Sequence, residues 1–144
     1  MKALSIRQPW AWLIVNGYKD IENRNWRTKY RGPVLIHASA VKPSKADMEV
    51  AREIMQHYAV SHRLPERHNF PLGGIVGIST ITGCVDESPS PWFFGFNGFT
   101  LADAKVLPFR PFKGRLSFFE TGMRPHKVFN VLVPEGYKDA TEME

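Results

Sequence analysis

The stretch GGIVGISTITGCV (residues 73–85) decides the fold, because it combines β-branched residues with recurring glycines. β-Branched runs favour strands, and glycines inside a strand indicate bulges. We therefore expect one long, bulged strand here. Working outward from it, shorter runs of the same kind predict strands at residues 1–6, 33–38, 99–109, 114–120 and 127–133.

Two helices are expected in the first half of the chain. Residues 9–16 place apolar side chains at helical spacing between Pro9, which suits a first helical turn, and Gly17, which suits a C-terminal cap. Ser44 with Asp47 three positions later predicts the start of the second helix. Together these elements predict an α+β fold: a small β-barrel of about six to seven strands, covered by two or more helices.

Length and charge narrow the class of protein. The 144 residues suit one domain, predicted at residues 1–135, followed by a C-terminal tail at residues 136–144. No apolar run approaches the roughly 20 residues of a membrane helix, and no export signal is recognised, so we expect no membrane partner and a cytoplasmic location. A net charge of +5 favours anionic partners such as nucleic acid, although surplus surface lysines explain it equally well.

The segment NGYKDIENRNW (residues 16–26) carries the most reactive residues. If it continues as a strand, Glu22 and Arg24 share one face and Lys19 lies at the strand's mouth. Beside an apolar wall from the preceding helix, such charges interact strongly, so a carboxylate could activate water while the lysine stabilises an oxyanion. The alternative, favoured by spacing alone, is an exposed ladder of ion pairs that contributes little stability.

Other features point to nucleic acid or to the core. Residues 24–31 interleave cations with aromatic rings, as in surfaces that stack bases and meet phosphates, yet a solvated loop with Trp26 in the core fits equally well. His37 stands in an apolar strand, which is typical of a hydrogen-bonded core histidine. The spacing of His, Cys and carboxylate residues matches no metal site, so neither a metal nor another cofactor is expected.

Several segments together resemble the ASCH domain family. They are LSIRQPW (4–10), the order Gly17, Lys19, Glu22, Arg24, and the later segments VLIHA (34–38), GFTLADAKVLP (98–108) and PFKGRL (111–116). The resemblance implies a PUA-like β-barrel. Some members of the family bind RNA or DNA, and small bacterial members resemble N4-acetylcytidine amidohydrolases. The N-terminal half is also similar to small eukaryotic single-domain ASCH proteins.

The resemblance assigns roles residue by residue. Lys19 matches the lysine of the amidohydrolases, but Glu22 stands where the best-known bacterial branch has a threonine nucleophile. That difference favours water activated by a carboxylate over acyl-threonine chemistry. The same branch has a catalytic glutamate after its central strand, and Asp86 or Glu87 occupies that region here as a candidate second acid.

The leading hypothesis is an amidohydrolase that removes the acyl group from N4-acylated cytosine or cytidine, with Lys19 and Glu22 as the catalytic residues. The expected substrate-binding residues are Arg7, Gln8, Trp10, Arg24, Trp26 and His37. The expected partner is a modified cytidine nucleoside or RNA, and the oligomeric state is left open. Two alternatives remain at this point: an RNA-binding ASCH module, and a metal-independent ribonuclease that uses the same Lys–Glu cluster.

Overall fold

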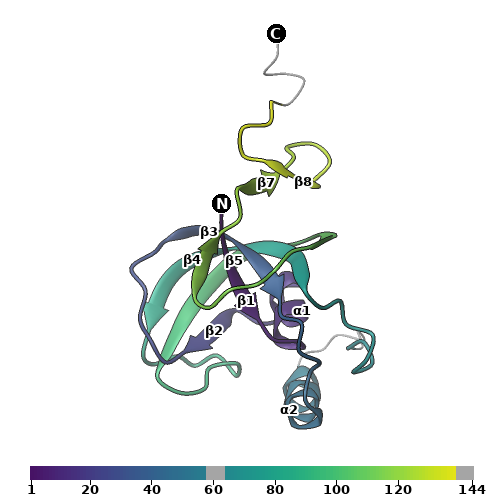
Figure 1. Cartoon of the computed structure of the whole chain (residues 1–144). Coiled ribbons are helices and arrows are strands. Elements are labelled where there is room, and N and C mark those ends of the chain that lie inside the picture. The colour runs from purple at the N-terminus through teal and green to yellow at the C-terminus, as the bar shows by residue number, and fades with distance from the viewer. Residues whose placement is uncertain (58–63, 139–144) are drawn as a thin grey trace.

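One long strand organises the molecule. The computed structural model describes residues 1–57 and 64–138. Its main sheet has six strands in the order β2-β5-β4-β3-β1-β6, which curl into a half-barrel (Figure 1). The strands are β1 (Lys2–Ile6), β2 (Ile21–Arg24), β3 (Gly32–Ala38), β4 (Gly74–Val85), β5 (Asn97–Pro111) and β6 (Phe118–Glu120). β1 pairs with β3 in parallel, and the other neighbours are antiparallel.

The curl comes from bulges between β4 and β5, as the glycines predict. The register between these strands shifts at three places, between Ile75 and Gly77, Ile78 and Thr80, and Ile81 and Gly83. Each bulge bends its strand and increases its twist. A side chain at Gly77 would lie 2.5 Å from the backbone oxygen of Lys105, so this glycine permits the close pairing.

The two predicted helices are confirmed. α1 (Trp10–Val15) packs its buried side chains against β3, β4 and β5, in the hollow of the half-barrel. α2 (Lys45–Met55) begins at Ser44, whose Oγ accepts the backbone N–H of Asp47 at 3.0 Å. α2 buries an apolar face against a cluster that includes Leu13 and Trp92.

The last part of the chain differs from the prediction. A two-stranded sheet of β7 (Met123–Pro125) and β8 (Leu132–Pro134) projects from the half-barrel (Figure 1). The expected strand at 114–120 is shortened to β6, because residues 113–117 form a loop in which Ser117 has a φ of 59°. The expected strand at 127–133 is mostly a turn, since His126 Nδ1 accepts the N–H groups of residues 128 and 129.

The α+β prediction is thus confirmed, with two of its strands misplaced. The single-domain boundary at residue 135 stays a prediction, and residues 139–144 of the predicted tail lie outside the described residues. Among the residues that the structure describes, no helix is long and apolar enough to cross a membrane.

Candidate functional site

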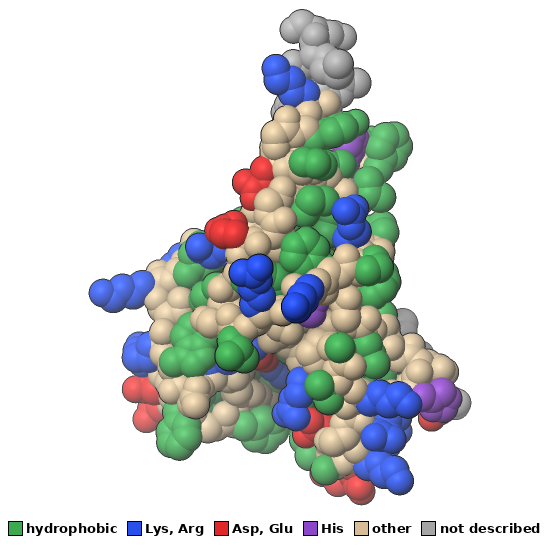
Figure 2. All heavy atoms as spheres, viewed as in Figure 1, with side chains coloured by type: hydrophobic (Ala, Val, Ile, Leu, Met, Phe, Trp, Pro, Cys, Tyr) green, Lys and Arg blue, Asp and Glu red, His purple; other side chains and the backbone are tan. Residues whose placement is uncertain are grey.

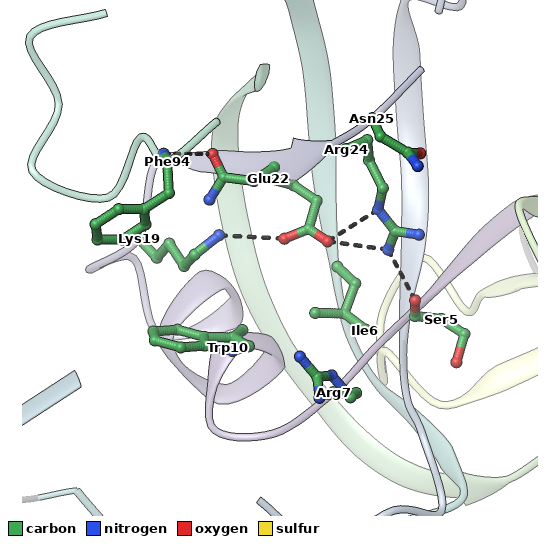
Figure 3. Close-up of a pocket in the computed structure, with 10 residues that line it drawn as sticks. Ser5, Ile6, Arg7, Trp10, Lys19, Glu22, Arg24, Asn25 and Phe94 are labelled. Carbon is green, nitrogen blue, oxygen red and sulfur yellow. Dashed lines mark hydrogen bonds and ion pairs between the residues drawn. The ribbon is translucent and has the colours of Figure 1, made fainter. Parts of the chain in front are cut away.

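A cavity of about 420 Å³ opens between α1 and β2. Five of the residues that the sequence singled out line it: Arg7, Trp10, Lys19, Glu22 and Arg24. They come from the segment after β1, from α1, from the turn between α1 and β2, and from β2, which are brought together when α1 folds into the hollow of the half-barrel (Figure 3).

Lys19 is held inside this wall by the end of α1. Gly17, with a φ of 84°, ends the helix in the left-handed conformation that glycine tolerates, and the Lys19 N–H then donates to the Leu13 oxygen at 3.0 Å. The Lys19 side chain is only 3% exposed. Its ammonium donates to Glu22 Oε1 at 3.1 Å and to the Ile21 backbone oxygen, and it lies 5.9 Å from the Trp10 ring.

Glu22 lies between two cations. Its Oε2 accepts from Arg24 Nε at 3.1 Å and forms an ion pair with Arg24 Nη2 at 2.9 Å, while Oε1 faces Lys19 (Figure 3). Arg24 Nη2 also donates to the Ser5 backbone oxygen at 2.9 Å and so ties β2 to β1. With Glu22 only 7% exposed, the cluster is a buried network and not an exposed ladder of ion pairs.

The arrangement has unused bonding capacity that faces a ligand-sized space. Each carboxylate oxygen has two lone pairs, so Glu22 can accept a further hydrogen bond, for instance from water. An ammonium has three donors, and two of those of Lys19 are engaged by described residues. The remaining donor can meet a developing negative charge, in the manner of an oxyanion hole.

The structure places the other predicted site residues elsewhere. Gln8 is fully buried and structural: its Oε1 accepts the Trp12 N–H at 2.8 Å and its Nε2 donates to the Pro71 oxygen at 3.2 Å. Trp26 packs in T-shaped contacts on Phe99 and Phe118 in the core. These two residues do not line the cavity, because each is occupied in holding the fold.

Three more of the predicted residues also lie away from this cavity. His37 is buried and borders a neighbouring cavity, most of whose lining residues do not line the first cavity. Asp86 and Glu87, the candidate second acids, are exposed just after β4 and line neither cavity. The described residues contain no group of three or more His, Cys, Asp or Glu side chains that could hold a metal ion.

Sequence reasoning missed five lining residues, namely Ser5, Ile6, Asn23, Asn25 and Phe94. Asn23 shows how the rim is built. Its Oδ1 accepts the Phe94 N–H at 2.8 Å and its Nδ2 donates to the Trp92 oxygen at 2.9 Å, which docks the loop before β5 onto β2. The position of Asn23 between two charged residues was a usable signal, whereas nothing periodic in that loop predicted Phe94.

One protein-family model and known proteins match part of this chain. The model of the ASCH domain matches residues 4–93, which include the residues of the ion network. Activating signal cointegrator 1 of Homo sapiens is 33% identical over 86 residues, and that of Mus musculus is 30% identical over 86 residues. In both comparisons the match covers 58% of this chain but only 14% of the relative, so this chain corresponds to a small part of those proteins.

The family match is informative at a coarse level. ASCH domains are PUA-like, in agreement with the half-barrel. The family is linked to RNA binding or a related function, and it is proposed to include hydrolases. Because the family model matches more than half of the chain, the chain belongs to the ASCH domain family.

Proposed function

We propose that this protein is an amidohydrolase that removes the acyl group from the exocyclic nitrogen of N4-acylated cytidine. The base and its acyl group occupy the cavity between α1 and β2. Glu22 takes a proton from a water molecule, whose oxygen attacks the acyl carbon. The bond between the acyl carbon and N4 then breaks, and the proton returns from Glu22 to the leaving nitrogen N4. The products are a carboxylic acid and cytidine.

The observation that carries this proposal is the buried pair of Lys19 and Glu22, 3.1 Å apart on the wall of a cavity of about 420 Å³. Pockets for small molecules typically measure about 300–1,000 Å³, so a nucleoside fits the size. Partial exclusion of water strengthens electrostatic interactions at such a wall. Lys19 can therefore stabilise the tetrahedral oxyanion with the N–H that Glu22 and Ile21 leave unused.

Neighbouring side chains suit the recognition of a base. The Trp10 ring lies at the cavity wall next to the Lys19 ammonium, so it can contact the face of a pyrimidine. Arg7 and Asn25 add donors at the rim that can meet the oxygen and ring nitrogen of cytosine. Arg24 positions Glu22 through its two contacts with Oε2.

Hydrolysis of N4-acetylcytidine, followed by its ultraviolet change to cytidine, tests the proposal. Lys19→Met and Glu22→Gln should each lower kcat/KM by about a hundredfold or more, because each removes a group that acts in the transition state. The isosteric amide of Glu22→Gln keeps the shape but only one acceptor oxygen, so it can bind only one of the two cations, and circular dichroism checks that the fold persists. Removing one partner of a buried pair can itself destabilise by about 3–5 kcal/mol, so the assay is run well below each variant's unfolding temperature.

Lys2 and Glu120 offer a matched control. They form an exposed ion pair at 3.3 Å outside the cavity, so Lys2→Met and Glu120→Gln should leave turnover unchanged. Wild-type protein that fails to hydrolyse a series of N4-acyl cytidines, or a Glu22→Gln variant with full activity, would contradict the proposal.

RNA binding without catalysis is the second candidate. Family membership and the net charge of +5 favour it. The aromatic part of residues 24–31 supports it less than the sequence suggested, because Trp26 and Tyr30 both pack on Phe118. The cations of the same segment, Arg27, Lys29 and Arg31, are exposed and can meet phosphates together with those that line the cavities.

A further inference from the structure

A second cavity of about 820 Å³ adjoins the first. The two share Ser5, Arg7 and Arg24, so they lie on either side of the same three residues. The second cavity extends from there to the loop between β5 and β6, which contributes Lys113 and Arg115. A molecule bound in the first cavity can thus continue into the second past Arg7, whose side chain is 61% exposed.

The second cavity is cationic. Arg7, Arg24, Lys113 and Arg115 line it, and its lining contains no Asp or Glu. Arg7 and Arg24 are partly neutralised by Asp47 and Glu22, respectively. Within the described residues, Lys113 and Arg115 form no ion pair and no side-chain hydrogen bond. Figure 2 shows Lys and Arg side chains gathered on this side of the molecule between the half-barrel and the projecting hairpin.

The loop that carries these two cations is fixed to the sheet. The ring of His37, which is 2% exposed, places Nε2 2.6 Å from the Phe112 backbone oxygen, so Nε2 carries the proton of this bond. Its Nδ1 forms a hydrogen bond with the Ser5 hydroxyl at 3.0 Å. A side chain at Gly114 would lie 2.6 Å from His37 Cε1, so only glycine permits the loop to approach this closely. Lys113 and Arg115 flank that contact point.

We propose that the second cavity binds a phosphate of a cytidine nucleotide whose base lies in the first cavity, so that the preferred substrate is a nucleotide and not a free nucleoside. Lys113 and Arg115 supply the charge that the phosphate needs, and Arg groups in particular match phosphate oxygens in pairs. This inference rests on the proposed function for the identity of the base, but not on turnover. The same chemistry arises in a mononucleotide or within an RNA strand.

Binding and kinetics together test the proposal. Calorimetry with cytidine, cytidine 5′-monophosphate, cytidine 3′-monophosphate and a short cytidine oligonucleotide measures affinity, and the N4-acetyl forms of the same compounds give KM and kcat. We expect at least one phosphorylated compound to bind at least tenfold more tightly than cytidine, with a correspondingly lower KM for its acetylated form. This gain in affinity over cytidine should shrink in concentrated salt, because exposed charges are screened. Which phosphorylated compound gains most identifies the source of the phosphate.

Variants locate the effect. The double variant Lys113→Ala with Arg115→Ala should remove the gain for the phosphorylated compounds while leaving the kinetics of N4-acetylcytidine unchanged. Lys45→Ala with Arg52→Ala, two exposed cations on α2 outside both cavities, removes the same charge and should leave the gain intact. Gly114→Ala keeps every charge but displaces the loop, so it should reduce the gain as well.

The outcomes separate this inference from the proposed function. Hydrolysis of N4-acetylcytidine with equal affinity for cytidine and every phosphorylated compound overturns the phosphate subsite and leaves the amidohydrolase standing. Tighter nucleotide binding that depends on Lys113 and Arg115, without any hydrolysis, supports the subsite and contradicts the amidohydrolase. A gain that survives the Lys113→Ala, Arg115→Ala double variant overturns the subsite.

Discussion

Arg24 shows how a single side chain can set the geometry of the site. Its Nε donates to Glu22 Oε2, while its Nη2 forms an ion pair with the same oxygen and donates to the Ser5 backbone oxygen. A lysine keeps the charge but has no planar fork, so it cannot make these contacts together. Arg24 therefore fixes both the direction of the carboxylate and the distance between β2 and β1.

Replacement of Arg24 by lysine should accordingly lower the free energy of unfolding by more than the loss of a surface contact does. We expect Arg24→Lys to lower the free energy of unfolding by about 1.5–3 kcal/mol, the usual contribution of hydrogen bonds to charged groups. Urea denaturation measures this change. Arg27→Lys is the matched control, because exposed Arg27 makes only a 3.4 Å contact with Asn97, and it should change stability by less than about 0.5 kcal/mol. Equal effects of the two substitutions would contradict this role of Arg24.

At the scale of residues, the helical and strand periodicity of the sequence predicted which charged side chains lie together. Lys19, Glu22 and Arg24 were expected together because a helix cap and a strand with period two place them so, and they do meet. Gln8 and Trp26 were expected to bind substrate, yet they lie outside the cavity, since composition does not distinguish a polar or aromatic group that binds a ligand from one that the fold itself satisfies. Phe94 was missed because its loop is positioned by Asn23, a contact across 71 residues of chain.

At the scale of elements, the site depends on how closely α1 approaches the sheet. Gly77 is the point of contact: a Cβ there would lie 2.7 Å from Val15 Cβ and 2.5 Å from the Lys105 backbone oxygen. Neither neighbour is the flexible end of a side chain, so an added methyl group must move the helix or open the bulge. Either movement would shift Trp10, the first residue of α1, and Lys19, whose backbone N–H is bonded to the Leu13 oxygen of that helix.

Gly77→Ala should therefore destabilise the protein by about 1–3 kcal/mol, the usual cost of overpacking, and should raise KM by moving the cavity wall. Thermal unfolding and steady-state kinetics measure the two effects. Gly136→Ala is the control, because a Cβ at Gly136 meets no atom within 4 Å, and it should be neutral. An unchanged melting temperature for Gly77→Ala would show that the contact is softer than its geometry indicates.

Elements with strong local patterns were predicted well, and those fixed by distant contacts were not. The bulged strand β4, the helix start at Ser44 and the strand β3 follow from glycines, caps and β-branched runs. The loop before β6 looks β-like in sequence, but His37, 75 residues away from Phe112, binds its backbone and holds it out of the sheet. A histidine that binds the backbone of another segment leaves no periodic trace.

At the scale of the whole molecule, the distribution of positive charge makes RNA binding testable through its dependence on salt. The chain carries a net charge of +5, and four cations line the second cavity. If RNA follows the two cavities and makes about three phosphate contacts, the logarithm of the binding constant should fall with a slope near −2 against the logarithm of salt concentration. A fourfold rise in salt should then weaken binding about 20-fold.

Fluorescence anisotropy with a labelled single-stranded RNA measures this slope. Lys113→Ala should reduce its magnitude by about 0.7, since one fewer phosphate is neutralised, whereas Lys45→Ala on α2 should leave it unchanged. RNA affinity that does not vary with salt would contradict binding through these cavities. Loss of RNA binding with intact turnover of nucleosides would separate the two candidate functions.

The buried ion network has one further consequence. Lys19 and Arg24 share the single carboxylate of Glu22, so the cluster holds one positive charge in excess within a wall that water reaches poorly. A neutral acyl amide leaves that excess unbalanced. In the tetrahedral intermediate Glu22 holds the proton taken from water, so the oxyanion replaces the carboxylate as the negative partner of Lys19. Stable mimics with a permanent negative charge at that centre, such as phosphonamidates, are accordingly better starting points for inhibitors than uncharged amides of the same shape.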